Sequence, residues 1–154
     1  MSILQTENLT KIYGDGENAV HALRGINLTV EKGEFTAIVG TSGSGKSTLL
    51  HMLGGLDRPT TGKVMVDGKD IFSLSEEQLT IFRRRKIGFV FQSYNLVPVL
   101  NLYENIVLPL ELDGKKIDRE YIDQIAETLG LKDRLEALPN QLSGGQQQRV
   151  AIAR

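Results

Sequence analysis

Residues 40–47, Gly-Thr-Ser-Gly-Ser-Gly-Lys-Ser, have the types and the spacing that suit a bound triphosphate. The glycines allow the loop to curl, so that successive backbone N–H groups point at phosphate oxygens. Lys46 would reach the β and γ phosphates, the Ser47 hydroxyl would ligate Mg²⁺, and Thr48 can contact the α phosphate. A glycine-rich turn without a ligand is the alternative, but it does not explain a Lys-Ser pair at this spacing. The sequence therefore predicts a nucleotide site at Gly40, Thr41, Ser42, Gly43, Ser44, Gly45, Lys46, Ser47 and Thr48.

A second candidate anion site lies at residues 142–146, Leu-Ser-Gly-Gly-Gln, where a helix is expected to begin. Ser143 supplies a hydroxyl at the cap, and Gly144 and Gly145 supply backbone amides without side chains. Each glycine costs a helix about 1 kcal/mol relative to alanine, so the close approach of another group would explain both. Considered alone, a capped helix start without a ligand explains this stretch equally well.

The elements around the first loop follow from the hydrophobic pattern. Residues 3–39 contain short β-like runs that end in the apolar run 35–39, which predicts a buried strand. A helix is expected after the loop, and Gly54 and Gly55 would end it. The order strand, glycine loop, helix is the setting that a phosphate loop requires.

Three further features precede residue 92. Residues 63–71 predict a hairpin, because Asp67-Gly68 suits a type I′ turn. Ser75 begins a capping box and opens a helix that ends in the cations of residues 83–86. The run 87–91, Ile-Gly-Phe-Val-Phe, predicts a second buried strand.

The pattern becomes helical in the second part of the chain. Apolar residues recur at helical spacing between Asp118, the expected cap, and Gly130, the expected end. We expect a single domain over residues 1–154, with a β-rich part and the phosphate-loop core in 1–92 and a helical part in 93–154.

Composition limits the partners and the compartment. The formal net charge of −1 over 154 residues provides no general field for nucleic acid or an anionic membrane, so no nucleic-acid partner is expected. The absence of cysteine excludes disulfides and thiolate metal sites. The N-terminus resembles no signal peptide, and no apolar run approaches the ~18 residues that span a bilayer. We expect a cytosolic protein whose link to a membrane comes through a partner.

The two candidate anion sites together narrow the class. A GTPase would carry Asn-Lys-x-Asp or Thr-Lys-x-Asp, and neither occurs. Residues 83–85, three arginines, would suit the lid of a small-molecule kinase, but a solvated helix end is the preferred interpretation. The phosphate loop combined with Leu-Ser-Gly-Gly-Gln at 142–146 resembles the ATP-binding cassette (ABC) family, of which that pentapeptide is the signature motif.

The resemblance runs from about residue 3 to the last residue and implies an α/β P-loop NTPase fold. Its parts would be an N-terminal antiparallel β part, an incomplete parallel core sheet and a helical subdomain. Tyr13 in Lys-Ile-Tyr-Gly looks like the aromatic loop that stacks on adenine, although a tyrosine at a strand end is common. Gln92 in Phe-Gln-Ser looks like the glutamine loop. The resemblance implies that Gln92 is a catalytic residue and that Gln92 and Ser47 both lie at the Mg²⁺ ion. The signature would bind the γ phosphate held by a second cassette, through Ser143, Gly144, Gly145 and Gln146.

A finer likeness is visible in residues 14–23, 49–64 and 89–110, which are similar to the cassettes of bacterial exporters for lipoproteins, macrolides and bacitracin-like peptides. It implies a homodimeric ATPase that drives transport through a separate membrane permease, on the inner face of the cell membrane. The alternative is a soluble cassette protein without a transport role. One apolar set would line a groove for the permease or form an ordinary buried helix start: Leu96, Val97, Val99, Leu100 and Leu102.

The carboxylate pair that the family uses for hydrolysis has no counterpart in the sequence. Asp67 follows an apolar run but precedes a glycine, which indicates the hairpin turn, and His21 and His51 lie in the wrong context for the family's later histidine. The sequence departs from the family by stopping at Arg154, within the signature helix. We therefore expect a C-terminally truncated domain that binds ATP and Mg²⁺ without hydrolysing ATP.

Overall fold

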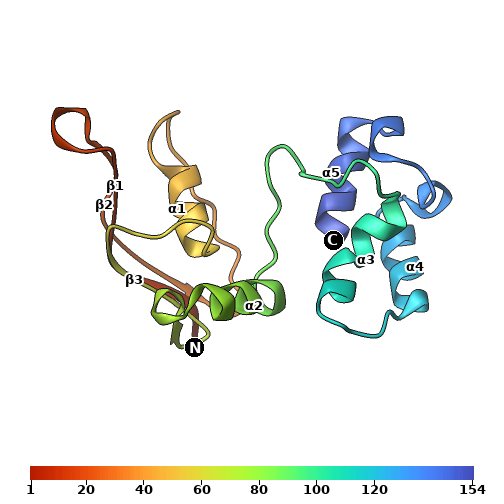
Figure 1. The fold of residues 1–154 in the computed structure, drawn as a ribbon, viewed down its shortest axis with the longest axis horizontal. Helices are drawn as coiled ribbons and strands as arrows, with labels where there is room; N and C mark the ends of the chain where they lie inside the picture. Colours follow the sequence, from red (N-terminus) through yellow and green to blue (C-terminus); the bar gives the residue numbers. More distant parts are fainter. The chain divides into compact units, whose positions relative to one another are not determined.

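The structure, a computed structural model, describes residues 1–154 as two compact units, 1–87 and 88–154 (Figure 1). Each unit has its own elements and its own hydrophobic core. The α-helices are α1 (Lys46–Leu53), α2 (Glu76–Lys86), α3 (Leu102–Leu112), α4 (Arg119–Thr128) and α5 (Gly144–Ala153). Short 3-10 helices are η1 (Gly16–Asn18), η2 (Ile71–Ser73), η3 (Lys132–Arg134) and η4 (Pro139–Gln141).

The first unit is built on one antiparallel sheet of four strands. These are β1 (Ser2–Tyr13), β2 (Val20–Glu31), β3 (Thr61–Val66) and β4 (Lys69–Asp70), in the spatial order β2-β1-β3-β4. The long central strand β1 pairs with β2 on one side and β3 on the other. The β3–β4 turn is confirmed, because Asp67 and Gly68 both have positive φ, 52° and 73°, as a type I′ turn requires.

The core of the first unit joins the sheet to α1 and α2. Leu9 and Val64 come from the sheet, Met52 from α1 and Leu79 from α2, and all four are buried in one cluster. Ser75 caps α2 in the predicted capping box, and Gly54 caps the end of α1. The sheet and the cluster therefore hold the start of α1 close to β2, where the glycine loop joins the helix.

The second unit packs three helices around a separate core. Leu102 and Ile106 of α3, Ile122 of α4 and Val150 of α5 are buried together. The predicted cap is confirmed at Asp118, whose side chain accepts a hydrogen bond from Tyr121 N at 3.1 Å. The apolar set at 96–102 is divided, since Leu102 is fully buried whereas Val99 is 79% exposed.

Two strand predictions are wrong. Residues 35–39 and 87–91 form no strand; Phe35 is 96% and Val39 86% exposed, and Phe89 and Phe91 contact each other with ring centroids 4.7 Å apart. An extended segment becomes a strand only when a neighbour satisfies its backbone groups, and neither segment has a paired strand beside it. For the same reason no parallel core sheet is formed, whereas the antiparallel part is confirmed.

Candidate functional site

The glycine loop ends on a helix that begins differently from the other four. Gly45 is the N-cap of α1 and offers no side chain, whereas side-chain caps satisfy the starts of α2, α3, α4 and α5. The first N–H groups of a helix have no partner within the helix and carry its partial positive charge. The start of α1 therefore presents free donors that suit an anion.

The conformation of the loop requires glycine at position 45 and leaves little room for a side chain at position 40. Gly45 has φ +88°, and a Cβ there would lie 2.4 Å from the carbonyl oxygen of Ala22. A Cβ on Gly40 would lie 2.7 Å from Ser44 Oγ. A side chain at Gly45 would collide with backbone and force the loop open, whereas at Gly40 the Ser44 hydroxyl could rotate away.

Lys46 holds the loop in its curled form. Its ammonium donates to the carbonyl oxygens of Gly40 at 2.9 Å and Thr41 at 2.7 Å, and to Ser44 Oγ at 3.3 Å. A lysine ammonium has three donors, and each points at an oxygen of the loop. The positive charge is thereby fixed at the place where phosphate oxygens would enter.

An open pocket of about 390 Å³ lies over this loop and brings together Tyr13 and residues 42–48 of the predicted site, whereas Gly40 and Thr41 do not line it. Its lining comprises Tyr13, Val20, His21, Ala22, Ser42, Gly43, Ser44, Gly45, Lys46, Ser47 and Thr48. Sequence analysis missed the three residues Val20, His21 and Ala22. They are the first residues of β2. Because Val20 pairs with Tyr13 at the end of β1, the strand pairing places all three at the pocket.

Tyr13 is 41% exposed at the end of β1. Burial raises the pKa of its phenol above the usual value, and the hydrogen bond that the phenol donates to Asp57 raises this pKa further. The phenol is therefore neutral at physiological pH. The ring is available as a flat apolar surface at the rim of the pocket.

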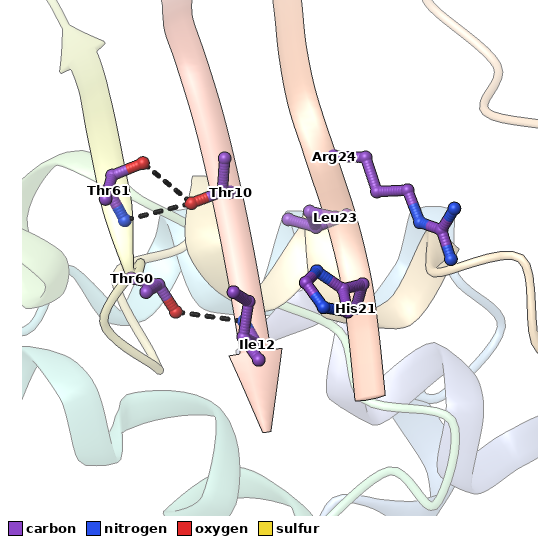
Figure 2. A pocket seen from close by; sticks show the side chains of 7 residues that line it. All are labelled: Thr10, Ile12, His21, Leu23, Arg24, Thr60 and Thr61. Carbon is purple, nitrogen blue, oxygen red and sulfur yellow. Dashed lines mark hydrogen bonds between the residues drawn. The ribbon is translucent and has the colours of Figure 1, made fainter. Parts of the chain in front are cut away.

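A larger pocket of about 580 Å³ lies on the sheet and shares His21 with the smaller one (Figure 2). It is lined by Thr10, Ile12, His21, Leu23, Arg24, Thr60 and Thr61. Its threonines serve the fold: the hydroxyls of Thr10 and Thr61 are 2.7 Å apart, and Thr60 Oγ1 accepts from Ile12 N at 2.9 Å. It contains none of the phosphate-loop residues, and we place the candidate site at the smaller pocket.

The signature stretch begins α5 in the second unit with a reciprocal cap. Ser143 Oγ accepts from Gln146 N at 3.3 Å, and Gln146 Oε1 accepts from Ser143 N at 2.9 Å. Gly144 and Gly145 have no positive φ, and a Cβ on either would meet its nearest neighbour at 3.8 Å, an ordinary contact. Packing within the chain therefore does not explain these two glycines.

Gln92 is exposed in a turn of the second unit, where Tyr94 N donates to Phe91 O at 3.0 Å. Two residues near it escaped sequence analysis. The Tyr94 hydroxyl lies 3.8 Å from the position of a Cβ on Gly144. Arg154, at the end of α5, donates to the carbonyl oxygens of Asn95 at 2.8 Å and Tyr94 at 3.2 Å. Arg154 thus joins the turn after Gln92 to the end of the signature helix, and the Tyr94 hydroxyl lies near the start of that helix.

The family profile described as ABC transporter matches residues 23–154. An uncharacterised ABC transporter ATP-binding protein of Thermotoga maritima is 52% identical over 154 residues, which cover 99% of this chain and 66% of that protein. The lipoprotein-releasing system ATP-binding protein LolD of Geobacter metallireducens is 50% identical, over 99% of this chain and 69% of its own length. The macrolide export ATP-binding/permease protein MacB of Aggregatibacter actinomycetemcomitans is 47% identical, over all of this chain and 24% of its own length.

Solved structures agree in fold. The ATP-binding cassette MJ0796, described as a dimer in a post-hydrolysis state bound to ADP and Pi, superposes with a TM-score of 0.87 at 46% identity, covering 97% of this chain and 67% of that one. A second dimeric structure of MJ0796, described as a bacterial ABC transporter cassette, gives a TM-score of 0.89 at 44% identity. None of the helices described above has the length and apolar character needed to cross a membrane.

Proposed function

We propose, since the chain belongs to the ABC transporter family of ATP-binding proteins, that it is the ATP-binding part of an exporter motor. The observation that carries the proposal is the pocket over the glycine loop, where Lys46 and the uncapped start of α1 converge. A triphosphate supplies the negative oxygens that this cation and these N–H donors lack.

Each pocket residue has a role that its chemistry supports. Lys46 exchanges its loop carbonyls for the β and γ phosphate oxygens, and Thr48 contacts the α phosphate. Ser47, an exposed hydroxyl on the first turn of α1, fits Mg²⁺, which prefers oxygen ligands. Tyr13 stacks on adenine from the rim. Bound Mg²⁺ would supply charge neutralisation between the phosphates.

The two signature glycines support a second cassette as partner. Because nothing within the chain requires them, we infer that an outside group approaches the start of α5 closely, and a γ phosphate held by another copy fits that position. Ser143, Gly144 and Gly145 would meet that phosphate, and Gln146 would hold Ser143 in its capping position. Two solved structures of a relative are described as dimers, which supports a second copy as the kind of partner.

Hydrolysis needs more than binding. Gln92 would approach Mg²⁺ and the attacking water, but the 154 residues include no Asp-Glu pair after an apolar run to orient and deprotonate that water. We therefore propose that this chain binds ATP without steady turnover, and that the complete protein hydrolyses it. The absence of a general base typically removes a factor of about 10² to 10⁴.

An export role, with a permease as membrane partner and a place on the inner face of the cell membrane, is supported by the relatives named LolD and MacB. Their names state lipoprotein release and macrolide export. A soluble cassette without a transport role is the alternative.

The test combines titration calorimetry with a phosphate-release assay. Mg-ATP should bind the unaltered chain, and Lys46→Ala should weaken binding by removing the charge on the β and γ phosphates. Phosphate release should stay at background for both. Unchanged affinity in Lys46→Ala would refute the assigned pocket, and steady turnover that Lys46→Ala abolishes would refute the inactivity of this chain.

A further inference from the structure

The loop after α1 carries a carboxylate that reaches the rim of the candidate nucleotide pocket. Tyr13 OH donates to Asp57 Oδ2 at 2.9 Å, and Lys11 Nζ donates to Asp57 Oδ1 at 2.8 Å. We propose that Asp57, held by Lys11, is a positioning residue that fixes the Tyr13 ring for stacking on a nucleobase. The inference rests on the proposed nucleotide-binding function, but it assigns a role to residues outside the pocket lining.

The Lys11–Asp57 pair is well placed to be rigid. The side chain of Lys11 is only 13% exposed and that of Asp57 35%, so solvent screens the pair less than a surface pair. Lys11 Nζ also donates to the carbonyl oxygen of Arg58 at 2.7 Å, and Arg58 N donates to Asp57 Oδ1 at 2.7 Å. Both carboxylate oxygens of Asp57 are thus committed, one of them to Tyr13.

The same charges act on the ring itself. Lys11 Nζ lies 4.8 Å from the centroid of the Tyr13 ring, a distance at which a cation attracts an aromatic ring. Burial raises the pKa of Asp57, but the hydrogen bonds from Lys11, Tyr13 and Arg58 N outweigh it, and the net pKa is lowered. The carboxylate is therefore charged and remains an acceptor for the phenol at neutral pH.

A second set of contacts pins this loop to β1 (Figure 2). Thr60 N donates to Thr10 O at 2.9 Å, and Thr60 Oγ1 accepts from Ile12 N at 2.9 Å. Residues 10 and 12 of β1 thus bind Thr60, whereas residues 11 and 13 bind Asp57. The loop therefore forms hydrogen bonds with four successive residues of β1. These bonds fix the loop on the strand, and with it the position of the Tyr13 ring.

The consequence is a preorganised stacking surface. A free tyrosine at a strand end would have to be immobilised when the base binds, and ordering one such side chain reduces affinity. Asp57 removes that cost before binding. Because its effect acts through the ring, it should change the affinity for nucleotides but not for an inorganic polyphosphate that occupies only the glycine loop.

The test compares two ligands and four chains by titration calorimetry. Asp57→Ala should weaken binding of Mg-ATP about 3- to 10-fold and leave binding of Mg-tripolyphosphate unchanged. Tyr13→Phe, which keeps the ring but removes the donor, should produce the same selective loss. The double variant should lose no more than either single variant, because both remove one interaction.

A matched control removes a carboxylate elsewhere. Asp67 also pairs with a lysine, since Lys86 Nζ lies 3.0 Å from its Oδ2, but it lies in the β3–β4 turn and lines no part of the pocket. Asp67→Asn should leave the affinity for both ligands unchanged, because asparagine tolerates the left-handed backbone of this turn.

The chain also offers a spectroscopic readout, because it contains four tyrosines and no tryptophan. Asp57→Ala should lower the pKa of one tyrosine in the ultraviolet absorbance titration of tyrosinate, whereas Asp67→Asn should not.

Several outcomes would overturn the role of Asp57: unchanged ATP affinity in Asp57→Ala, an equal loss for both ligands, or losses that multiply in the double variant. Failure of the proposed nucleotide-binding function would give a different result. In that case the unaltered chain would bind neither ligand, or Lys46→Ala would change neither affinity.

Discussion

At the candidate site, charged side chains are held by backbone oxygens and by each other before any ligand arrives. Lys46 is fixed by the carbonyl oxygens of Gly40 and Thr41, and Lys11 by Asp57 and the carbonyl oxygen of Arg58. Lys11 is therefore preorganised for the Tyr13 ring, whereas Lys46 is held within the loop and would exchange these carbonyl oxygens for those of a phosphate. Preorganisation of this kind lowers the cost of ordering side chains on binding.

Asp57 should give the first unit a specific acid sensitivity. Its pKa is lower in the folded chain than the usual value near 4, so its contribution to stability is fully present above about pH 4. That contribution is lost as the pH falls through the lower folded pKa. In urea unfolding, Asp57→Asn should be less stable than the unaltered chain at about pH 7, and the gap should shrink at about pH 3.

A gap that stays constant over this range would contradict the assignment, because the destabilisation would then have no electrostatic origin. Asp67→Asn is again the control, since no comparable network surrounds that exposed carboxylate.

The glycine loop and the helix after it could be predicted from sequence because their residues are contiguous, and the phosphate-binding role of the loop stays a prediction. Asp57 and His21 could not. Asp57 reaches Tyr13 across 44 positions of the chain, and His21 reaches the pocket only because β2 pairs with β1. Contacts of this kind depend on strand register, which a single sequence does not specify.

At the scale of elements, four helices begin with a side-chain cap that satisfies their first N–H groups, and α1 begins without one. Local capping patterns predicted Ser75, Asp118 and Ser143 correctly, because a cap joins residues two or three positions apart. The strands expected at 35–39 and 87–91 failed, because a strand depends on a distant partner. The exceptional helix start, at Gly45, coincides with the phosphate loop.

Glycine-to-alanine substitutions should separate these two uses of glycine. Gly145→Ala should leave the free energy of unfolding unchanged or raise it by up to about 1 kcal/mol, because its φ is not positive and a Cβ would meet only an ordinary contact at 3.8 Å. Gly45→Ala should destabilise the chain, since its Cβ would lie 2.4 Å from Ala22 O at φ +88°. Urea unfolding measures both. A clear loss of stability in Gly145→Ala would mean that the fold itself requires that glycine.

Asn105 is the polar group on which the start of the second unit depends. It is fully buried, and its side chain accepts from Val97 N at 2.8 Å and donates to the carbonyl oxygens of Val97 and Leu100 at 3.1 and 2.9 Å. Asn105→Ala should lower the free energy of unfolding by about 2–4 kcal/mol, because it leaves several of these groups unpaired. An exposed amide on α5, removed in Gln148→Ala, should cost little. A loss below about 1 kcal/mol for Asn105→Ala would show that water replaces these bonds.

At the scale of the whole molecule, the chain has two hydrophobic cores and one sheet, and the sheet packs only against the core of the first unit. The apolar residues of the sheet, α1 and α2 form one cluster, and those of α3, α4 and α5 form the other. The run 35–39, Phe-Thr-Ala-Ile-Val, belongs to no paired strand. Of its side chains only Ile38 packs against a core, that of the first unit. Its backbone is open to pairing with another chain.

This exposed run should make the chain self-associate. It combines β-forming and apolar residues and contains neither charge nor proline, the composition of segments that pair between chains. Sedimentation should show concentration-dependent association, and an apolar dye should bind. Val39→Lys should reduce both, because a charge on the segment opposes edge pairing.

Val99→Lys is the matched control, because Val99 is 79% exposed, close to the 86% of Val39. Val99 follows a proline and belongs to no such run, so association should persist in this variant. A monomer at all concentrations without dye binding would show that the apolar run finds cover within its own chain.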